Sequence, residues 1–254
     1  MTRAPTELAP RIEARATAIA AASVEERYRD PFWVERFGAD GRRLAGDDEV
    51  DLVAMLAESL HFGAPEPLVR YVRMVRGAMV ARGMCSRHLS EQLARIGTFC
   101  CDAGIEDPGP IPAYLEQARK ALRRPVGAAA LIDEVEDALA DDVASSLAST
   151  RAAWSVWSDP EGWPRVRHDA ALLVSYLADA LAEQRSEIFL EHAAWTAGFF
   201  ARQGRPDGYA EALLAALDHE VEELPALARI EAARLVARAR LDRTLQAARG
   251  TGVH

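Results

Sequence analysis

The chain has 254 residues, of which 50% are hydrophobic and 27% are charged, a composition typical of a folded globular protein and too apolar for a disordered one. Thirty lysines and arginines against 39 aspartates and glutamates leave a net charge of −9, which argues against non-specific binding to nucleic acid. No apolar run is long enough to span a membrane, no secretory signal is recognisable, and three cysteines cannot all pair, so we expect a cytoplasmic protein with free thiols.

The predicted elements of the first half are helices. Apolar residues recur there at helical spacing, and glycines mark the ends of the pattern. The predicted helices run from a cap at Asp47 or Asp48 to Gly63, from Leu68 to Gly83, and from Ser86 through Ile96.

The second half continues with the same pattern after a break. The stretch 107–112 is rich in proline and glycine and predicts a break, followed by a short helix over 113–123. The acidic run 133–137 is interpreted as one solvated helix face. Further helices are predicted over 169–182, 188–203, 207–217 and 225–249, and no alternating strand pattern occurs, so the predicted fold class is all-α.

The two halves align with each other when the sequence is shifted by 121 positions. Trp33 then falls on Trp154, Asp48 on Asp169, and Gly83 on Gly204, without a gap between them. We interpret this as one helical unit written twice. The predicted organisation is a first helical repeat over 1–105, a linker with a short helix over 106–128, a second helical repeat over 129–225, and a C-terminal helix and tail over 226–254.

A family resemblance accompanies the repeat. The residues that carry it are Arg42-Arg43-Leu44-Ala45-Gly46-Asp47-Asp48, then Leu52, Leu56, Leu60, Gly63, Leu68 and Gly83-Met84. This pattern resembles the middle of a phycobiliprotein subunit, and the resemblance implies two tandem globin-like helical bundles. In that family a cysteine three residues before the aspartate holds the bilin, whereas here that position is Ala45 in one copy and Val166 in the other. The resemblance therefore implies a tetrapyrrole-type ligand only in non-covalent form.

The second copy carries aromatic side chains that the first copy lacks. Tyr176, Trp157, Trp163 and Trp195 have no aromatic counterparts in the first copy, and His192 takes an inward position of the repeat. An apolar, aromatic-lined cavity with one imidazole suits a flat hydrophobic ligand. These five residues are the predicted ligand site, and a bulkier core is the alternative explanation for them.

Two short motifs are weak candidates for a metal site. Glu58 and His61 share a helical face with the spacing of di-iron proteins, and Cys85 and His88 stand at a helix start. Each motif lacks the further ligands that such sites need, so no metal site is predicted. No nucleotide-binding, zinc-protease or nucleophile-elbow motif occurs, and no catalytic residue is predicted.

These patterns favour a non-enzymatic sensory or regulatory protein that binds a hydrophobic or tetrapyrrole-type ligand non-covalently. Two alternatives stay open. One is a protein-interaction module that uses a basic stripe of Arg70, Arg73, Arg76 and Arg82. The other is a metal-dependent helical-bundle enzyme. A small hydrophobic ligand or a protein is the expected partner, and neither nucleic acid nor a membrane is expected.

Overall fold

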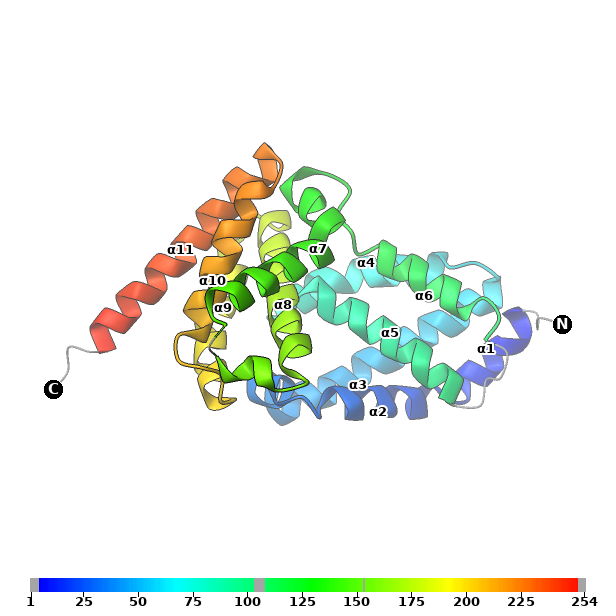
Figure 1. Cartoon of the computed structure of the whole chain (residues 1–254). Coiled ribbons are helices and arrows are strands. Elements are labelled where there is room, and N and C mark those ends of the chain that lie inside the picture. The colour runs from blue at the N-terminus through cyan, green and yellow to red at the C-terminus, as the bar shows by residue number, and fades with distance from the viewer. Residues whose placement is uncertain (1–4, 103–107, 153, 251–254) are drawn as a thin grey trace. The chain divides into compact units, whose positions relative to one another are not determined.

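Helices form all the regular structure of the described residues, which are 5–102, 108–152 and 154–250 of this computed structural model (Figure 1). The predicted all-α class is confirmed. The helices group into two units: unit 1 contains α1 to α6, and unit 2 contains α7 to α11 together with the turn Gly83–Cys85. Within the described ranges, no helix has the length and apolar character that a membrane crossing requires. The first residue of the predicted break, Asp107, lies outside the described residues.

Unit 1 is built around its longest helix. Its helices are α1 (Pro5–Glu13), α2 (Ala16–Arg27), α3 (Pro31–Phe62), α4 (Glu66–Ala81), α5 (Ser86–Asp102) and α6 (Ile111–Lys120). The other helices of unit 1 all pack against α3, and α5 also packs on α2 and α6. Leu52, Leu56 and Leu60 follow one another at helical spacing and are fully buried, so this face of α3 forms the core.

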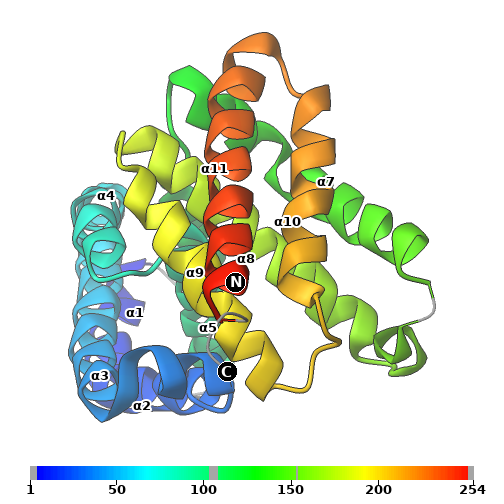
Figure 2. The ribbon, with the colours of Figure 1, turned by 90° about the vertical axis from the view of Figure 1, so that its left-hand side faces the viewer.

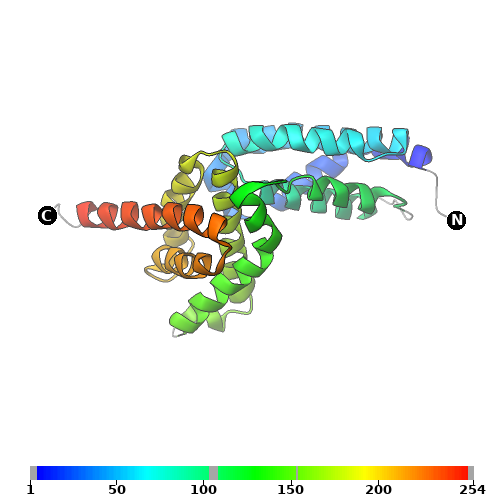
Figure 3. The same ribbon diagram turned by 90° about the horizontal axis from the view of Figure 1, so that it is seen from above.

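Unit 2 has α8 at its centre. Its elements are α7 (Gly127–Thr150), the short 3-10 helix η1 (Ser155–Ser158), α8 (Gly162–Ala182), α9 (Ser186–Arg202), α10 (Tyr209–Glu220), the 3-10 turn η2 (Val221–Glu223) and α11 (Ala226–Gly250). Every residue of α8 from Asp169 to Ala180 is buried. Helix α11 lies between α9 and α10 (Figure 2), and its last turns extend past the other helices of unit 2 (Figure 3).

The start of α3 differs from the sequence prediction, and the predicted cap at Asp47 or Asp48 is wrong. The helix begins at Pro31, and the Asp30 side chain caps it by accepting a hydrogen bond of 2.9 Å from the backbone amide of Phe32. Gly38 interrupts the helix with φ of 63°, so the apolar pattern before this residue is out of phase with the pattern after it. The predicted start of a helix near Ser86 is confirmed, since α5 begins at this residue.

Residues 121 positions apart adopt the same conformation at the helix ends. Gly63 after α3 has φ of 68° and Gln184 after α8 has φ of 54°, both left-handed. Gly83 and Gly204, which follow α4 and α9, have φ of 85° and 69°. A left-handed residue therefore follows α3 and α8 at corresponding positions, and likewise follows α4 and α9.

The helix packing also corresponds between the units. Shifted by 121 positions, α3 overlaps α8, α4 overlaps α9, α5 overlaps α10, α6 overlaps α11, and α1 with α2 overlaps α7. The pairs α3–α4, α2–α5, α5–α6 and α4–α6 pack in unit 1, and the corresponding pairs α8–α9, α7–α10, α10–α11 and α9–α11 pack in unit 2. Positions 121 residues apart therefore lie on helices that pack in corresponding pairs.

Candidate functional site

Two of the predicted ligand residues are buried against each other in unit 2. The rings of Tyr176 on α8 and His192 on α9 stack with centroids 3.6 Å apart and planes 12° apart. The Tyr176 hydroxyl donates a hydrogen bond of 2.6 Å to the carbonyl of Gly83. Because the two ring faces are already in contact, a flat ligand could enter between them only by separating the rings.

The other three predicted ligand residues lie elsewhere in unit 2. Trp195 is half-buried and stacks on Phe199 at 4.9 Å. The rings of Trp157 and Trp163 are 6.3 Å apart, and 41% of Trp163 is exposed. Trp163 lies in the first turn of α8, and Tyr176 lies further along the same helix, roughly 20 Å away at about 1.5 Å per residue. The structure therefore pairs these aromatic residues locally and does not place Trp163 and Tyr176 around one cavity.

The weak metal candidates also occupy separate environments. Glu58 is half-buried on α3, whereas His61 near the end of the same helix is exposed. Cys85 and His88 are buried, and the His88 ring lies 4.8 Å from the ring of Trp33. Within the described ranges, no group of three or more histidine, cysteine, aspartate or glutamate side chains is placed to hold a metal ion.

Two arginines of the predicted basic stripe are used within unit 1. Arg76 donates a hydrogen bond of 3.3 Å to the carbonyl of Leu122, and Arg82 forms an ion pair of 2.9 Å with Asp48. Arg70 and Arg73 are exposed on α4. The stripe that could face a partner is therefore smaller than the sequence suggests.

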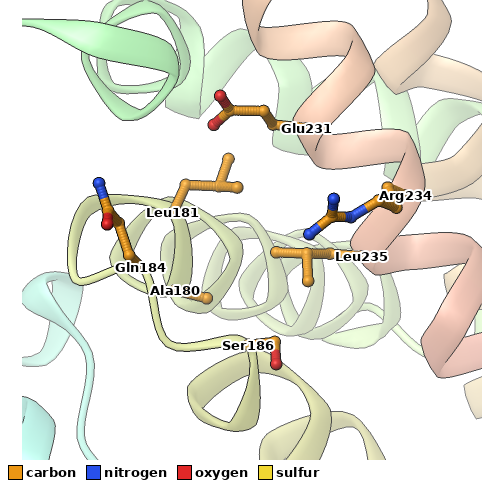
Figure 4. Close-up of a pocket in the computed structure, with 7 residues that line it drawn as sticks. All are labelled: Ala180, Leu181, Gln184, Ser186, Glu231, Arg234 and Leu235. Carbon is orange, nitrogen blue, oxygen red and sulfur yellow. The ribbon is translucent and has the colours of Figure 1, made fainter.

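An open pocket of about 330 Å³ lies in unit 2, between the end of α8, the start of α9 and α11 (Figure 4). Its lining consists of Ala180, Leu181, Gln184, Ser186, Glu231, Arg234 and Leu235. Glu231 and Arg234, its two charged residues, are both exposed. Exposed charges are well hydrated, so the pocket offers a binding surface without a buried polar group to select a ligand.

Unit 2 buries charged groups that have oppositely charged partners. Arg124 contacts the carboxylates of Asp133 and Asp179, and all three side chains are at most 5% exposed. The interpretation of 133–137 as a fully solvated face is therefore wrong at Asp133, because the backbone amide of Arg124 also donates a 2.6 Å hydrogen bond to it. The buried charge of Arg124 therefore has two anionic partners within unit 2.

A third buried carboxylate of unit 2, Asp169, also pairs with an arginine. Asp169 accepts a hydrogen bond of 2.9 Å from the Tyr209 hydroxyl and forms an ion pair of 3.1 Å with Arg205. Burial raises the pKa of Asp169, and the charge of Arg205 and the hydrogen bond from Tyr209 act against this rise. Its counterpart in unit 1, Asp48, pairs with Arg82, so both units place an arginine beside this aspartate.

Unit 1 contains a different group of buried polar residues, which we call the polar cluster. Its members come from three helices that pack together, and they are Ser23 and Arg27 on α2, Glu49 on α3, and Gln92 and Arg95 on α5. Ser23, Glu49 and Gln92 have no exposed surface, and Arg27 is 3% exposed. Arg95 is half-buried. Polar side chains of this kind are seldom fully buried.

The hydrogen-bonding capacity of the polar cluster is only partly used. Arg27 and Glu49 form a buried ion pair. Within the described ranges, the Ser23 hydroxyl, both polar atoms of the Gln92 amide, and Nε and Nη2 of Arg95 are shielded from solvent and have no hydrogen-bond partner. A buried donor or acceptor without a partner costs about 1–3 kcal/mol, so such groups are uncommon unless they serve a purpose.

The equivalent positions of unit 2 are apolar. Ser23, Arg27, Glu49, Gln92 and Arg95 correspond to Ala144, Ala148, Ala170, Leu213 and Ala216. Ala144, Ala170, Leu213 and Ala216 are buried, on helices that pack on one another in the same pairs. Since unit 2 forms the same packing with alanine and leucine, the fold does not require polar residues at these positions.

Sequence reasoning missed the polar cluster although a signal for it existed. Gln92 and Arg95 interrupt the apolar face formed by Leu89, Leu93 and Ile96, and the repeat aligns them with Leu213 and Ala216. These polar residues differ between the halves in the same way as the aromatic residues of the second copy, and this difference is the signal in the sequence.

Compared with protein-family models, curated proteins and solved structures, the chain gives no match.

Proposed function

We propose that this chain is a non-enzymatic, ligand-binding regulatory protein made of two helical units that descend from one duplicated unit. In this proposal unit 1 is the copy that binds the ligand, and unit 2 is the copy that keeps an apolar core at the same place. The observation that carries the proposal is the replacement of the five polar residues of unit 1 by four alanines and one leucine in unit 2.

The duplication is supported by local geometry and by packing. Matching left-handed turns follow α3 and α8, and follow α4 and α9. Trp33 contacts the ring of His88, and Trp154 contacts the ring of Tyr209, which stands at the equivalent position. A globin-like character of each unit, as the phycobiliprotein resemblance implies, is part of this proposal.

The chain path provides a way for ligand binding in unit 1 to affect unit 2. The turn Gly83–Cys85 belongs to unit 2, although the helices before and after it belong to unit 1. Tyr176 holds this turn through its hydrogen bond to Gly83. Helix α5, which carries Gln92 and Arg95, begins at Ser86, directly after the turn. A shift of α5 would therefore act on this turn through the main chain.

Hydrogen exchange on the whole chain tests the proposal. A small-molecule extract of the native host should slow amide exchange in peptides from α2 and α5 of the wild-type protein. The same extract should have no effect on these peptides in the variant Ser23→Ala, Gln92→Leu, Arg95→Ala, which carries the side chains of unit 2. Equal slowing in both proteins, or no slowing in α2 and α5, would contradict the proposal.

Non-covalent tetrapyrrole binding stays a prediction for unit 2. Protein purified from its native host should then show absorbance in the visible range, and replacement of His192 should reduce it. A spectrum with only the ultraviolet protein band would argue against a pigment.

A further inference from the structure

One edge of the Arg95 guanidinium makes no hydrogen bond to the described residues. Its Nε and Nη2 atoms are shielded from solvent and lack a hydrogen-bond partner within the described ranges. In a guanidinium these two nitrogens carry parallel N–H groups that lie in the plane of the group, along one edge. This pair of donors matches the two oxygens of a carboxylate, or two oxygens of a phosphate.

Three carboxylates act on Arg95 through their charge but have contacts with other groups: Glu91 with Arg87, Glu26 with Arg29, and Asp30 with the backbone amide of Phe32. Burial is the largest influence on Arg95 and lowers its pKa. The guanidinium therefore carries a charge that the surrounding protein solvates poorly.

The remaining members of the polar cluster add donors and a positive charge. Gln92 lies one helical turn before Arg95 on α5, and its amide nitrogen is a buried donor without a partner within the described ranges. Arg27 and Arg95 supply two positive charges, and Glu49 is the one fully buried carboxylate beside them. The other carboxylates that act on Arg95, Glu91, Glu26 and Asp30, are partly or fully exposed to solvent. Burial and the charge of Arg95 lower the pKa of Arg27 to about 9, so an additional anion would favour both charged arginines.

We propose that the polar cluster of unit 1 binds a small oxyanion, a carboxylate or phosphate group, whose oxygens accept hydrogen bonds from Arg95 Nε and Nη2 and from Gln92 Nε2. This inference rests on the proposed function and names the chemical class of its ligand. Arg95 is half-buried, so the anion enters at its side of the cluster. The corresponding place in unit 2 has no cation, because Ala148 and Ala216 replace the two arginines.

Trp33 provides a local reporter for this site. The Arg27 guanidinium lies 4.9 Å from the centre of the Trp33 ring, and the other four tryptophans are in unit 2. In full-length protein labelled with 5-fluorotryptophan, the ¹⁹F resonance of Trp33 is assigned with the variant Trp33→Phe. Sodium acetate and inorganic phosphate are then titrated separately at constant ionic strength, with chloride as the balancing salt.

We expect the Trp33 resonance to shift saturably with at least one of the two anions. Saturation with acetate alone identifies a carboxylate ligand, and saturation with phosphate alone identifies a phosphate. Arg95→Ala and Arg95→Lys should each weaken the apparent affinity at least tenfold, because lysine keeps the charge but loses the paired donors. Gln92→Leu should also weaken it. The matched control Arg73→Ala removes an exposed arginine of unit 1 and should leave the titration unchanged.

Two results would overturn the inference. One is a titration of Arg95→Lys that superimposes on that of the wild-type protein. The other is a Trp33 resonance that moves only in proportion to anion concentration, or not at all. If neither anion binds while the host extract still protects α2 and α5 from exchange, the proposed function stands and only the oxyanion class is wrong.

Discussion

At the residue scale, the polar cluster contains buried polar groups whose hydrogen-bonding capacity is only partly used, which is expected to lower the stability of unit 1. Gln92 has no exposed surface, and its amide has no hydrogen-bond partner within the described ranges. Without ligand, Gln92→Leu should therefore raise the free energy of unfolding by about 1–3 kcal/mol, measured by urea denaturation. The reciprocal change Leu213→Gln in unit 2 buries the same amide in an apolar setting and should lower it by about 2 kcal/mol or more. A loss of stability in Gln92→Leu would contradict this account.

The cysteines give a second prediction at this scale. Cys85 and Cys100 are buried, Cys101 is exposed, and burial raises the pKa of the Cys100 thiol to about 12. Because the thiolate is the reactive form, the native protein at pH 8 should show one fast-reacting thiol towards a disulfide reagent. Cys101→Ser should remove the fast phase. If a fast phase remains in Cys101→Ser, then Cys85 or Cys100 is more accessible than the structure indicates.

At the element scale, the turns after α3 and α8 form a natural comparison. Gly63 and Gln184 hold the same left-handed position, with hydrogen bonds of 3.0 Å from the following amide to Ser59 and Ala180 respectively. A side chain at this φ costs about 1 kcal/mol, and no atom lies within 4 Å of where a Cβ on Gly63 would be. Gln184→Gly should therefore raise the free energy of unfolding by about 1 kcal/mol, and Gly63→Ala should lower it similarly. Equal midpoints in thermal or urea unfolding would contradict the comparison.

Helices were predictable from the sequence where a local signal exists. Gly63 and Gly83 end α3 and α4, and the apolar spacing of Leu52, Leu56 and Leu60 places their face in the core. The start of α3 was missed because Gly38 changes the phase of the pattern. The only local signal for this helix start is the cap at Asp30 followed by Pro31, and a pattern of two residues is too short to predict a helix start by itself.

At the scale of the whole molecule, each unit has its own core and its own buried charges. Arg124 joins Asp133 and Asp179 within unit 2, so Arg124→Ala should remove the positive charge beside two buried carboxylates and destabilise unit 2 by about 3–5 kcal/mol. In urea, the ¹⁹F resonances of the tryptophans of unit 2 should then report unfolding at lower denaturant than that of Trp33. Arg165→Ala, which breaks an exposed ion pair of the same unit, is the control and should have a much smaller effect. A common shift of all five resonances would instead indicate that the units unfold together.

The sequence by itself determined the helical class and many helix ends, because helical periodicity and glycine turns are local properties of the chain. It also predicted the alignment of the two halves. Only the tertiary structure decided which polar residues are buried. Ser23, Glu49 and Gln92 lie far apart in sequence, and α2, α3 and α5 must pack together before any of them loses contact with water. The stacking of Tyr176 on His192 and the pairing of Asp133 with Arg124 were decided in the same way, since burial depends on contacts between helices and not on the spacing within one.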